Sequence, residues 1–123
     1  MVYIRGAAKE HGTKKRIEGD LKPGQKVVLV EDHVSTGGSS ISAVEALREE
    51  GQASVDCIVA INTYELQKAA DQFAAAQVDV FTLTNFTVIL SAAKAQGLID
   101  DAKEALLLDF RTDPATWAGK HGL

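Results

Sequence analysis

One run of residues sets the architecture of this chain: Val27-Val28-Leu29-Val30-Glu31-Asp32-His33-Val34-Ser35-Thr36-Gly37-Gly38-Ser39-Ser40. It opens with apolar, mostly β-branched residues, which favour a buried strand. Two adjacent acids follow, and a Ser/Thr/Gly turn then leads into a helix-forming stretch. The sequence therefore predicts a strand that carries two carboxylates to its C-terminal tip, followed by a loop that can wrap a phosphate. A sugar phosphate carries both hydroxyls and a phosphate, so it would satisfy both halves of the motif.

The turn has the composition of an anion-binding loop. Residues 35–39 lead into a helix N-terminus, where free backbone N–H groups and the helix dipole attract an anion. Gly37 and Gly38 allow close backbone approach and positive φ. The Gly-Lys-Ser/Thr ending of a nucleoside-triphosphate loop is absent, and the glycine spacing differs from the dinucleotide fingerprint. The acids can accept hydrogen bonds from a diol or lie near the hydration shell of a metal. The alternative is a capped strand-to-helix turn with surface acids.

The bulk composition narrows the class of protein. The chain has 123 residues, enough for one domain, with 46% apolar and 24% charged residues. A net charge of −4 at pH 7 argues against a nucleic-acid partner. No apolar run reaches the length of a membrane span, and the first residues lack the order of a signal peptide. The single cysteine, Cys57, excludes an intrachain disulfide, fits a cytoplasmic protein and is predicted to be a buried thiol.

Strands and helices alternate along the chain. Besides the opening strand, strands are predicted at 2–5, 55–61 and 78–83, and the polar, basic stretch 6–22 is predicted to be a long mobile loop. Helices are predicted at 39–50, at 66–76, from Thr84 or Asn85 to about 96, and from about 100 to 108. A last turn begins at Asp113-Pro114. This order predicts an α/β fold with a doubly wound parallel sheet, helices on both faces, and one domain over 1–123. Ligands then bind at the C-terminal edge of the strands.

A second motif places three cations upstream of the strand. In Tyr3-Ile4-Arg5-Gly6-Ala7-Ala8-Lys9-Glu10-His11-Gly12, the cationic side chains are Arg5, Lys9 and His11. Mobile cations that close over a polyanion can neutralise charge that builds on a leaving group. Taken alone, such a segment is usually a solvated basic loop. Together with a strand that ends in acids and a phosphate loop, it is better interpreted as a lid.

Both motifs resemble those of a known family. The segment 27–40 closely resembles the signature of type I phosphoribosyltransferases, which bind 5-phosphoribosyl-1-pyrophosphate. The segment 3–12 is similar to the catalytic loop of the orotate phosphoribosyltransferases within that family. Further similarity to bacterial members of that group lies in the segments 61–66, 82–86 and 113–117. The resemblance therefore covers nearly the whole chain and implies the type I phosphoribosyltransferase fold.

The resemblance implies specific roles for the motif residues. The donor-binding residues would be Glu31, Asp32, His33, Val34, Ser35, Thr36, Gly37, Gly38 and Ser39. The two acids would hold the ribose hydroxyls, and residues 35–39 would cradle the 5′-phosphate, with Ser35 also reaching orotate. Arg5, Lys9 and His11 would be the catalytic cations that close over pyrophosphate, serving the other subunit of a homodimer. Mg²⁺ would bind mainly through donor oxygens, with no direct protein ligand assigned.

The implied reaction joins orotate to the donor and releases orotidine 5′-phosphate and pyrophosphate, a step of pyrimidine synthesis. Two other functions stay open. One is a non-catalytic or regulatory module that binds only the donor, and the other is a phosphoribosyltransferase for another base, such as a purine. The Lys/His loop and the Tyr-Glu-Leu and Thr-Asn-Phe segments favour orotate over purines.

The chain also departs from the family pattern. Gly6 stands where some members carry a second basic residue. His33 stands where they usually carry an aliphatic residue, and it is expected to be a partly exposed loop histidine. The chain starts about where the second half of such an enzyme would start, so the N-terminal hood and first strands are expected to be missing. An unpaired sheet edge would then remain, with self-association or pairing with a separate chain, and little turnover by this chain alone.

Overall fold

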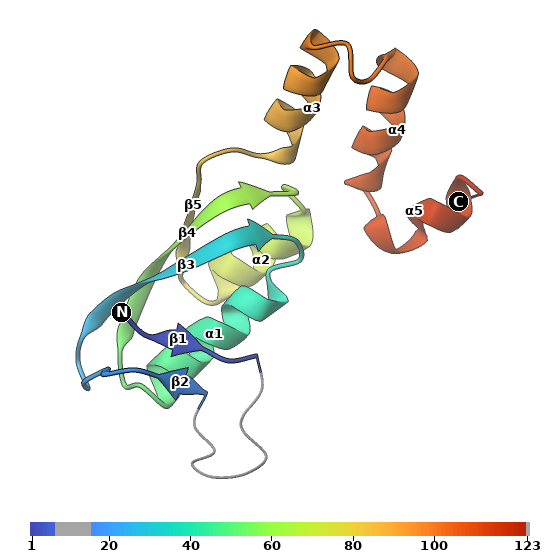
Figure 1. The fold of residues 1–123 in the computed structure, drawn as a ribbon. Coiled ribbons are helices and arrows are strands. Elements are labelled where there is room, and N and C mark those ends of the chain that lie inside the picture. Colours follow the sequence, from blue (N-terminus) through green and yellow to red (C-terminus); the bar gives the residue numbers. More distant parts are fainter. Residues whose placement is uncertain (7–15, 123) are drawn as a thin grey trace.

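The fold is a small parallel sheet covered by two helices. The computed structural model describes residues 1–6 and 16–122. The central sheet has the strand order β3-β4-β5, formed by β3 (Lys26–Val34), β4 (Ser54–Thr63) and β5 (Asp79–Thr82), and both pairs are parallel. The crossovers are α1 (Gly38–Glu49) and α2 (Gln67–Ala75), as Figure 1 shows. The predicted α/β alternation with a parallel sheet is confirmed.

The core lies between this sheet and the two crossover helices. Ile58 on β4 is fully buried, and Val44 and Leu47 on α1 are each 1% exposed. Phe73 brings α2 into the same hydrophobic cluster, so α1 and α2 lie on one face of the sheet. Val44 and Leu47 are three residues apart and therefore lie on one face of α1, and burying such apolar side chains is the main favourable term in folding.

The opposite face of the sheet is apolar and open among the described residues. The strand register places Val30 beside Val59, and Val59 beside Phe81, across all three strands. Val30 is 75% and Phe81 60% exposed. Within residues 1–6 and 16–122, helices cover one face of the sheet. Helices were expected on both faces, and the second face carries none in this part of the chain. In the same part of the chain β3 pairs with β4 alone, so the predicted unpaired edge is present.

Cys57 lies on β4 opposite Val28, a residue of the open face that is 56% exposed. The cysteine itself is only half-buried and forms no disulfide. The prediction of a buried thiol is therefore wrong. An apolar run in the sequence indicates burial on both faces of a strand, whereas here only one face of the strand is covered.

A short antiparallel pair stands beside the main sheet. β1 (Tyr3–Ile4) pairs with β2 (Ile17–Glu18). The strand at 2–5 is thus confirmed in shortened form, but the prediction that 6–22 is entirely loop is wrong at β2. Ile17 and Leu21 are the apolar residues of that stretch, and both pack against the core. A Cβ on Gly51, at the end of α1, would lie 2.6 Å from Leu21 Cδ2, which shows how closely this segment approaches the helix.

The last three helices extend from the carboxyl end of the sheet (Figure 1). They are α3 (Phe86–Ala95), α4 (Asp101–Phe110) and α5 (Pro114–Lys120). The Asn85 side chain accepts a hydrogen bond from Val88 N, so Asn85, rather than Thr84, is the N-cap of α3. Trp117 anchors α5 to α4, because its Nε1 donates to Leu106 O at 2.9 Å. None of the helices described has the length and apolar character needed to cross a bilayer.

Candidate functional site

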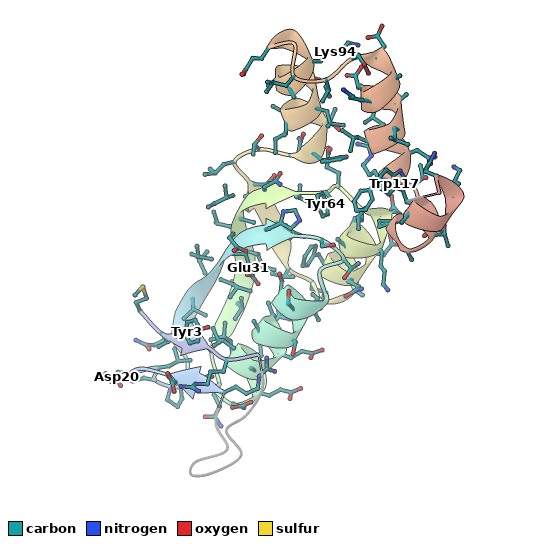
Figure 2. All side chains as sticks on the ribbon, turned by 45° about the vertical axis from the view of Figure 1, so that its right-hand side comes forward. Tyr3, Asp20, Glu31, Tyr64, Lys94 and Trp117 are labelled. Atoms are coloured by element: carbon teal, nitrogen blue, oxygen red, sulfur yellow. The ribbon has the colours of Figure 1, made fainter. Side chains whose placement is uncertain are left out.

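The predicted strand, acids, loop and helix follow one another at the carboxyl edge of the sheet. β3 ends at Val34, residues 35–37 turn, and α1 begins at Gly38. Figure 2 shows Glu31 on the sheet and Tyr64 between the sheet and the C-terminal helices. In open parallel sheets ligands bind at this edge, outside the carboxyl ends of the strands. The local fold therefore places the motif where a ligand can reach it.

The loop presents an uncapped helix N-terminus. Gly37 is the N-cap of α1, with φ of +87°, and no side chain caps the helix. A Cβ on Gly37 would lie 3.0 Å from Phe73 Cζ, so both the backbone conformation and the available space require glycine here. Ser35, Thr36, Gly38 and Ser39 are exposed. The first-turn N–H groups have no acceptor within the helix, which makes this turn suitable for an anion.

The two acids have different surroundings. Successive residues of a strand point to opposite faces, so Glu31 and Asp32 diverge. Glu31 lies on the α1 side, where its Oε1 accepts a hydrogen bond from Ser40 Oγ at 2.9 Å. Asp32 is exposed. The sequence grouped the acids as one paired tip, whereas the structure separates a fixed carboxylate from an exposed one.

Both acids nevertheless line one groove beside the free edge of β3. The groove has a volume of about 750 Å³ and lies between residues 27–32 of β3 and residues 1–4, with Ala43 and Leu47 contributing from α1. Its size is within the range of small-molecule sites. The groove therefore joins the acids to the apolar edge of the sheet.

His33 and Val34 differ from their predicted settings. His33 lies within β3, not in a loop, and its Nδ1 is 3.2 Å from Asn62 Nδ2 on β4. His33 Nε2 and Asn62 Oδ1 are buried without a hydrogen-bond partner among the described residues. The Val34 side chain is 2% exposed and belongs to the core cluster, so only its backbone could contact a ligand. The sequence motif predicted that the strand ends at the acids. Because β3 continues to Val34, both His33 and Val34 lie in the sheet and take their neighbours from it.

Of the predicted cations, only Arg5 lies in the described part of the chain. Its side chain pairs with Glu18 on β2, with Nε donating to Oε1 at 2.7 Å, and its carbonyl oxygen accepts from Arg16 Nε at 3.0 Å. Both partners of the Arg5–Glu18 pair are about 40% exposed, so the pair adds little stability. Lys9 and His11 lie outside the described residues. The structure thus places Arg5 directly after β1, and its described contacts do not include the acids of β3.

The sequence interpretation missed a polar cluster around Glu65. The Glu65 carboxylate accepts hydrogen bonds from Thr87 N at 3.1 Å and Thr87 Oγ1 at 2.6 Å, and it pairs with Arg111 Nη1 at 3.2 Å. Hydrogen bonds from the Thr87 hydroxyl and the Thr87 N–H, together with the Arg111 charge, hold the pKa of Glu65 below its usual value. Glu65 has φ of +59°, an unusual value for a residue with a side chain. No sequence pattern marks this cluster, because its members lie far apart in the chain.

Glu65 and Arg111 of this cluster line a second pocket, of about 910 Å³, that adjoins the turn at residues 35–39. Thr36 lines it from that loop, residues 65–68 from the start of α2, and residues 111–115 from the junction of α4 and α5. Tyr64 packs edge-on against His33 with ring centroids 4.2 Å apart, and against Phe110 at 5.4 Å. The C-terminal helices therefore dock on the carboxyl edge through an aromatic and a polar contact side by side.

The described residues of the site offer a hard cation little more than one exposed carboxylate. Within residues 1–6 and 16–122, no group of three or more His, Cys, Asp or Glu side chains is arranged to enclose a metal. The exposed Asp32 carboxylate offers the kind of oxygen that Mg²⁺ prefers. Mg²⁺ keeps several waters and is commonly bound through one or two carboxylates together with substrate phosphates. The site therefore suits an ion that arrives with a phosphorylated ligand.

The fold and the loop define a class of protein, and comparison with known families agrees. A model of the phosphoribosyl transferase domain matches residues 2–93. This chain belongs to the phosphoribosyltransferase domain family.

Individual relatives are also similar to this chain. It is 48% identical over 120 residues to an orotate phosphoribosyltransferase of Bacteroides thetaiotaomicron, covering 97% of this chain and 56% of the relative. It is 50% identical over 111 residues to one of Staphylococcus saprophyticus, covering 90% and 54%. The crystal structure of an orotate phosphoribosyltransferase from Aeropyrum pernix matches with a TM-score of 0.64 and 27% identity, covering 80% of this chain and 52% of that chain. The chain thus spans about half the length of these relatives.

Proposed function

We propose that this chain carries the donor-binding core of an orotate phosphoribosyltransferase, which transfers phosphoribosyl from 5-phosphoribosyl-1-pyrophosphate to orotate. The single observation that carries the proposal is the uncapped N-terminus of α1 at Gly37, which follows the acids of β3 directly in the chain, with a turn at residues 35–37 between them. Phosphate-binding amides and hydroxyl-binding carboxylates are what a sugar phosphate requires. The similarity to relatives named orotate phosphoribosyltransferase supports orotate as the acceptor.

The residues then divide the donor between them. Residues 35–39 bind the 5′-phosphate through backbone amides and hydroxyls, and Ser35 also reaches orotate. Glu31 and Asp32 accept hydrogen bonds from the ribose hydroxyls. Arg5, Lys9 and His11 close over pyrophosphate and stabilise the charge that develops as it leaves. Val34 contributes backbone atoms at the end of β3, because its side chain is buried in the core, and His33 precedes it in the same strand.

Mg²⁺, a second subunit and a cytoplasmic location complete the proposal. When bound with the donor, Mg²⁺ would supply charge neutralisation for pyrophosphate, and Asp32 is the exposed carboxylate that could contact its hydration shell. The segment from Arg5 to His11 would serve the site of the other subunit in a homodimer. The single cysteine of this chain fits a reducing compartment such as the cytoplasm.

Two measurements on the same sample test the proposal. Calorimetry with 5-phosphoribosyl-1-pyrophosphate and Mg²⁺ is expected to show binding, and the absorbance of orotate is expected to fall when orotate is added. Adenine and hypoxanthine serve as acceptor controls, since a purine enzyme would consume those instead. A folded sample that binds no donor would contradict the proposal at its base.

The second candidate function is a module that binds the donor without turning it over. The observation that favours it is the open apolar face around Val30 and Phe81, together with the unpaired edge of β3. This candidate predicts donor binding with no loss of orotate absorbance at any enzyme concentration. Orotate consumption that scales with the amount of protein would exclude it.

A further inference from the structure

Ser40 is the buried polar residue that the proposed roles leave unused. It is 1% exposed, and it is the one buried polar residue within residues 1–6 and 16–122. Its Oγ donates to Glu31 Oε1 at 2.9 Å. Burying a hydroxyl is unfavourable unless it forms a hydrogen bond, and Glu31 supplies the acceptor. A bond to an ionised carboxylate is also stronger than one between neutral groups.

The position of Ser40 connects the two halves of the candidate site. It lies in the first turn of α1, directly after the loop that begins the helix, and Ile41 N makes the first backbone bond back to Gly37 O at 2.9 Å. Its own N–H therefore belongs to the set without an intrahelical acceptor. Its side chain reaches across to β3. One residue thus links the turn at residues 35–39 to the carboxylate of Glu31.

We infer that Ser40 is a positioning residue for ribose recognition. By occupying Oε1, it holds the Glu31 side chain in one orientation, and Oε2 stays available to accept from a ribose hydroxyl. Because the hydroxyl belongs to α1, the carboxylate keeps a fixed place relative to the phosphate-binding turn. Such fixation removes the entropic cost of ordering a flexible glutamate when the ligand binds. This inference rests on the donor site proposed above.

A purely structural role for Ser40 makes a different prediction. If the hydrogen bond serves only to satisfy a buried hydroxyl, its loss weakens the whole first turn of α1. Binding of every phosphorylated ligand would then fall by the same factor. A positioning role affects only ligands that carry ribose hydroxyls, because inorganic phosphate does not involve Glu31.

NMR titrations of the chain with ribose 5-phosphate, 2-deoxyribose 5-phosphate and inorganic phosphate separate the two roles. Ser40→Ala is expected to lower the affinity for ribose 5-phosphate about tenfold, the effect typical of one charge-assisted hydrogen bond. Its affinity for inorganic phosphate should stay within about twofold, and its preference for ribose over deoxyribose should shrink. Ser40→Thr, which keeps the hydroxyl, should restore that preference.

Matched variants complete the experiment. Ser54→Ala also removes a serine-to-acid hydrogen bond, the 3.1 Å contact with Asp56, but at the amino end of β4, so its titrations should match the parent chain. In a Glu31→Gln background, Ser40→Ala should add no further loss of ribose preference. If Ser40→Ala leaves the preference unchanged, or weakens all three ligands equally, the inference is overturned. If the parent chain binds ribose 5-phosphate no better than phosphate, the donor site fails, and this inference fails with it.

Discussion

Glu65 and Arg111 lie 46 residues apart in the sequence, and their side chains meet at 3.2 Å. Both also contact Thr87, since Arg111 Nη1 donates to Thr87 Oγ1 at 2.8 Å. The contact ties the loop after β4 to the start of α3 and the end of α4. It therefore holds the C-terminal helices beside the carboxyl edge of the sheet, where they line the second pocket with Thr36.

Replacing Glu65 with glutamine should lower stability in a pH-dependent manner. The pKa of Glu65 is depressed in the folded chain, so its stabilising effect is present above the ordinary value of 4.5 and is lost as pH falls through the folded pKa. Urea unfolding at pH 7 should therefore show a lower midpoint for Glu65→Gln, and the difference from the parent should narrow in acid. The exposed Glu45 on α1 provides the control, Glu45→Gln. A constant difference at all pH values would contradict the prediction.

Alanine at Gly37 should destabilise the fold and abolish anion binding. A residue with a side chain is strained by about 1–2 kcal/mol at positive φ, and the new Cβ would also press on Phe73. Gly97→Ala is the matched control, because Gly97 has φ of +70° with no atom within 4 Å of the added Cβ. Urea unfolding should show a greater loss for Gly37→Ala than for Gly97→Ala. Equal losses would mean that the contact with Phe73 contributes nothing.

Replacing Asp32 with asparagine should lower the affinity for 5-phosphoribosyl-1-pyrophosphate while leaving the fold intact. The side chain is exposed, so its charge is not needed in the core. Loss of a carboxylate that accepts from ribose or from the hydration shell of Mg²⁺ should reduce donor affinity about tenfold in calorimetry. Asp56→Asn, an exposed acid on β4 near the amino end, serves as control. Unchanged affinity in Asp32→Asn would remove the donor-binding role from this residue.

Charging the open face should reduce self-association. Val30 and Phe81 lie on the same face, with Val59 between them on the central strand. Two lysines would therefore interrupt one continuous apolar surface. Light scattering across a range of protein concentrations should show a lower mean mass for Val30→Lys/Phe81→Lys. Leu98→Lys is a control at an apolar residue outside the sheet that is 69% exposed. If the double variant and the parent have the same mass at every concentration, this face does not drive association.

The motif residues could be predicted from the sequence because they are local. Apolar residues, adjacent acids, glycines and a helix start follow one another within the segment 27–40, so their order alone predicts strand, loop and helix. The start of a helix at Thr84 or Asn85 is likewise a local signal, and the structure makes Asn85 the N-cap. β2 and its pairing with β1 were missed because both strands are two residues long and separated by a dozen positions, which leaves no periodic pattern.

The sequence by itself determined the parallel α/β fold, the family and the order of the candidate donor-binding residues, because each depends on neighbours along the chain. Only the tertiary structure decided which side chains are paired, buried or free. It gave Glu31 a partner in Ser40, left Asp32 exposed, and placed Glu65 beside Arg111. The physical reason is that a strand sends successive side chains to opposite faces, and each face has its own neighbours. Those neighbours come from distant segments, so packing, not local pattern, sets the environment of each residue.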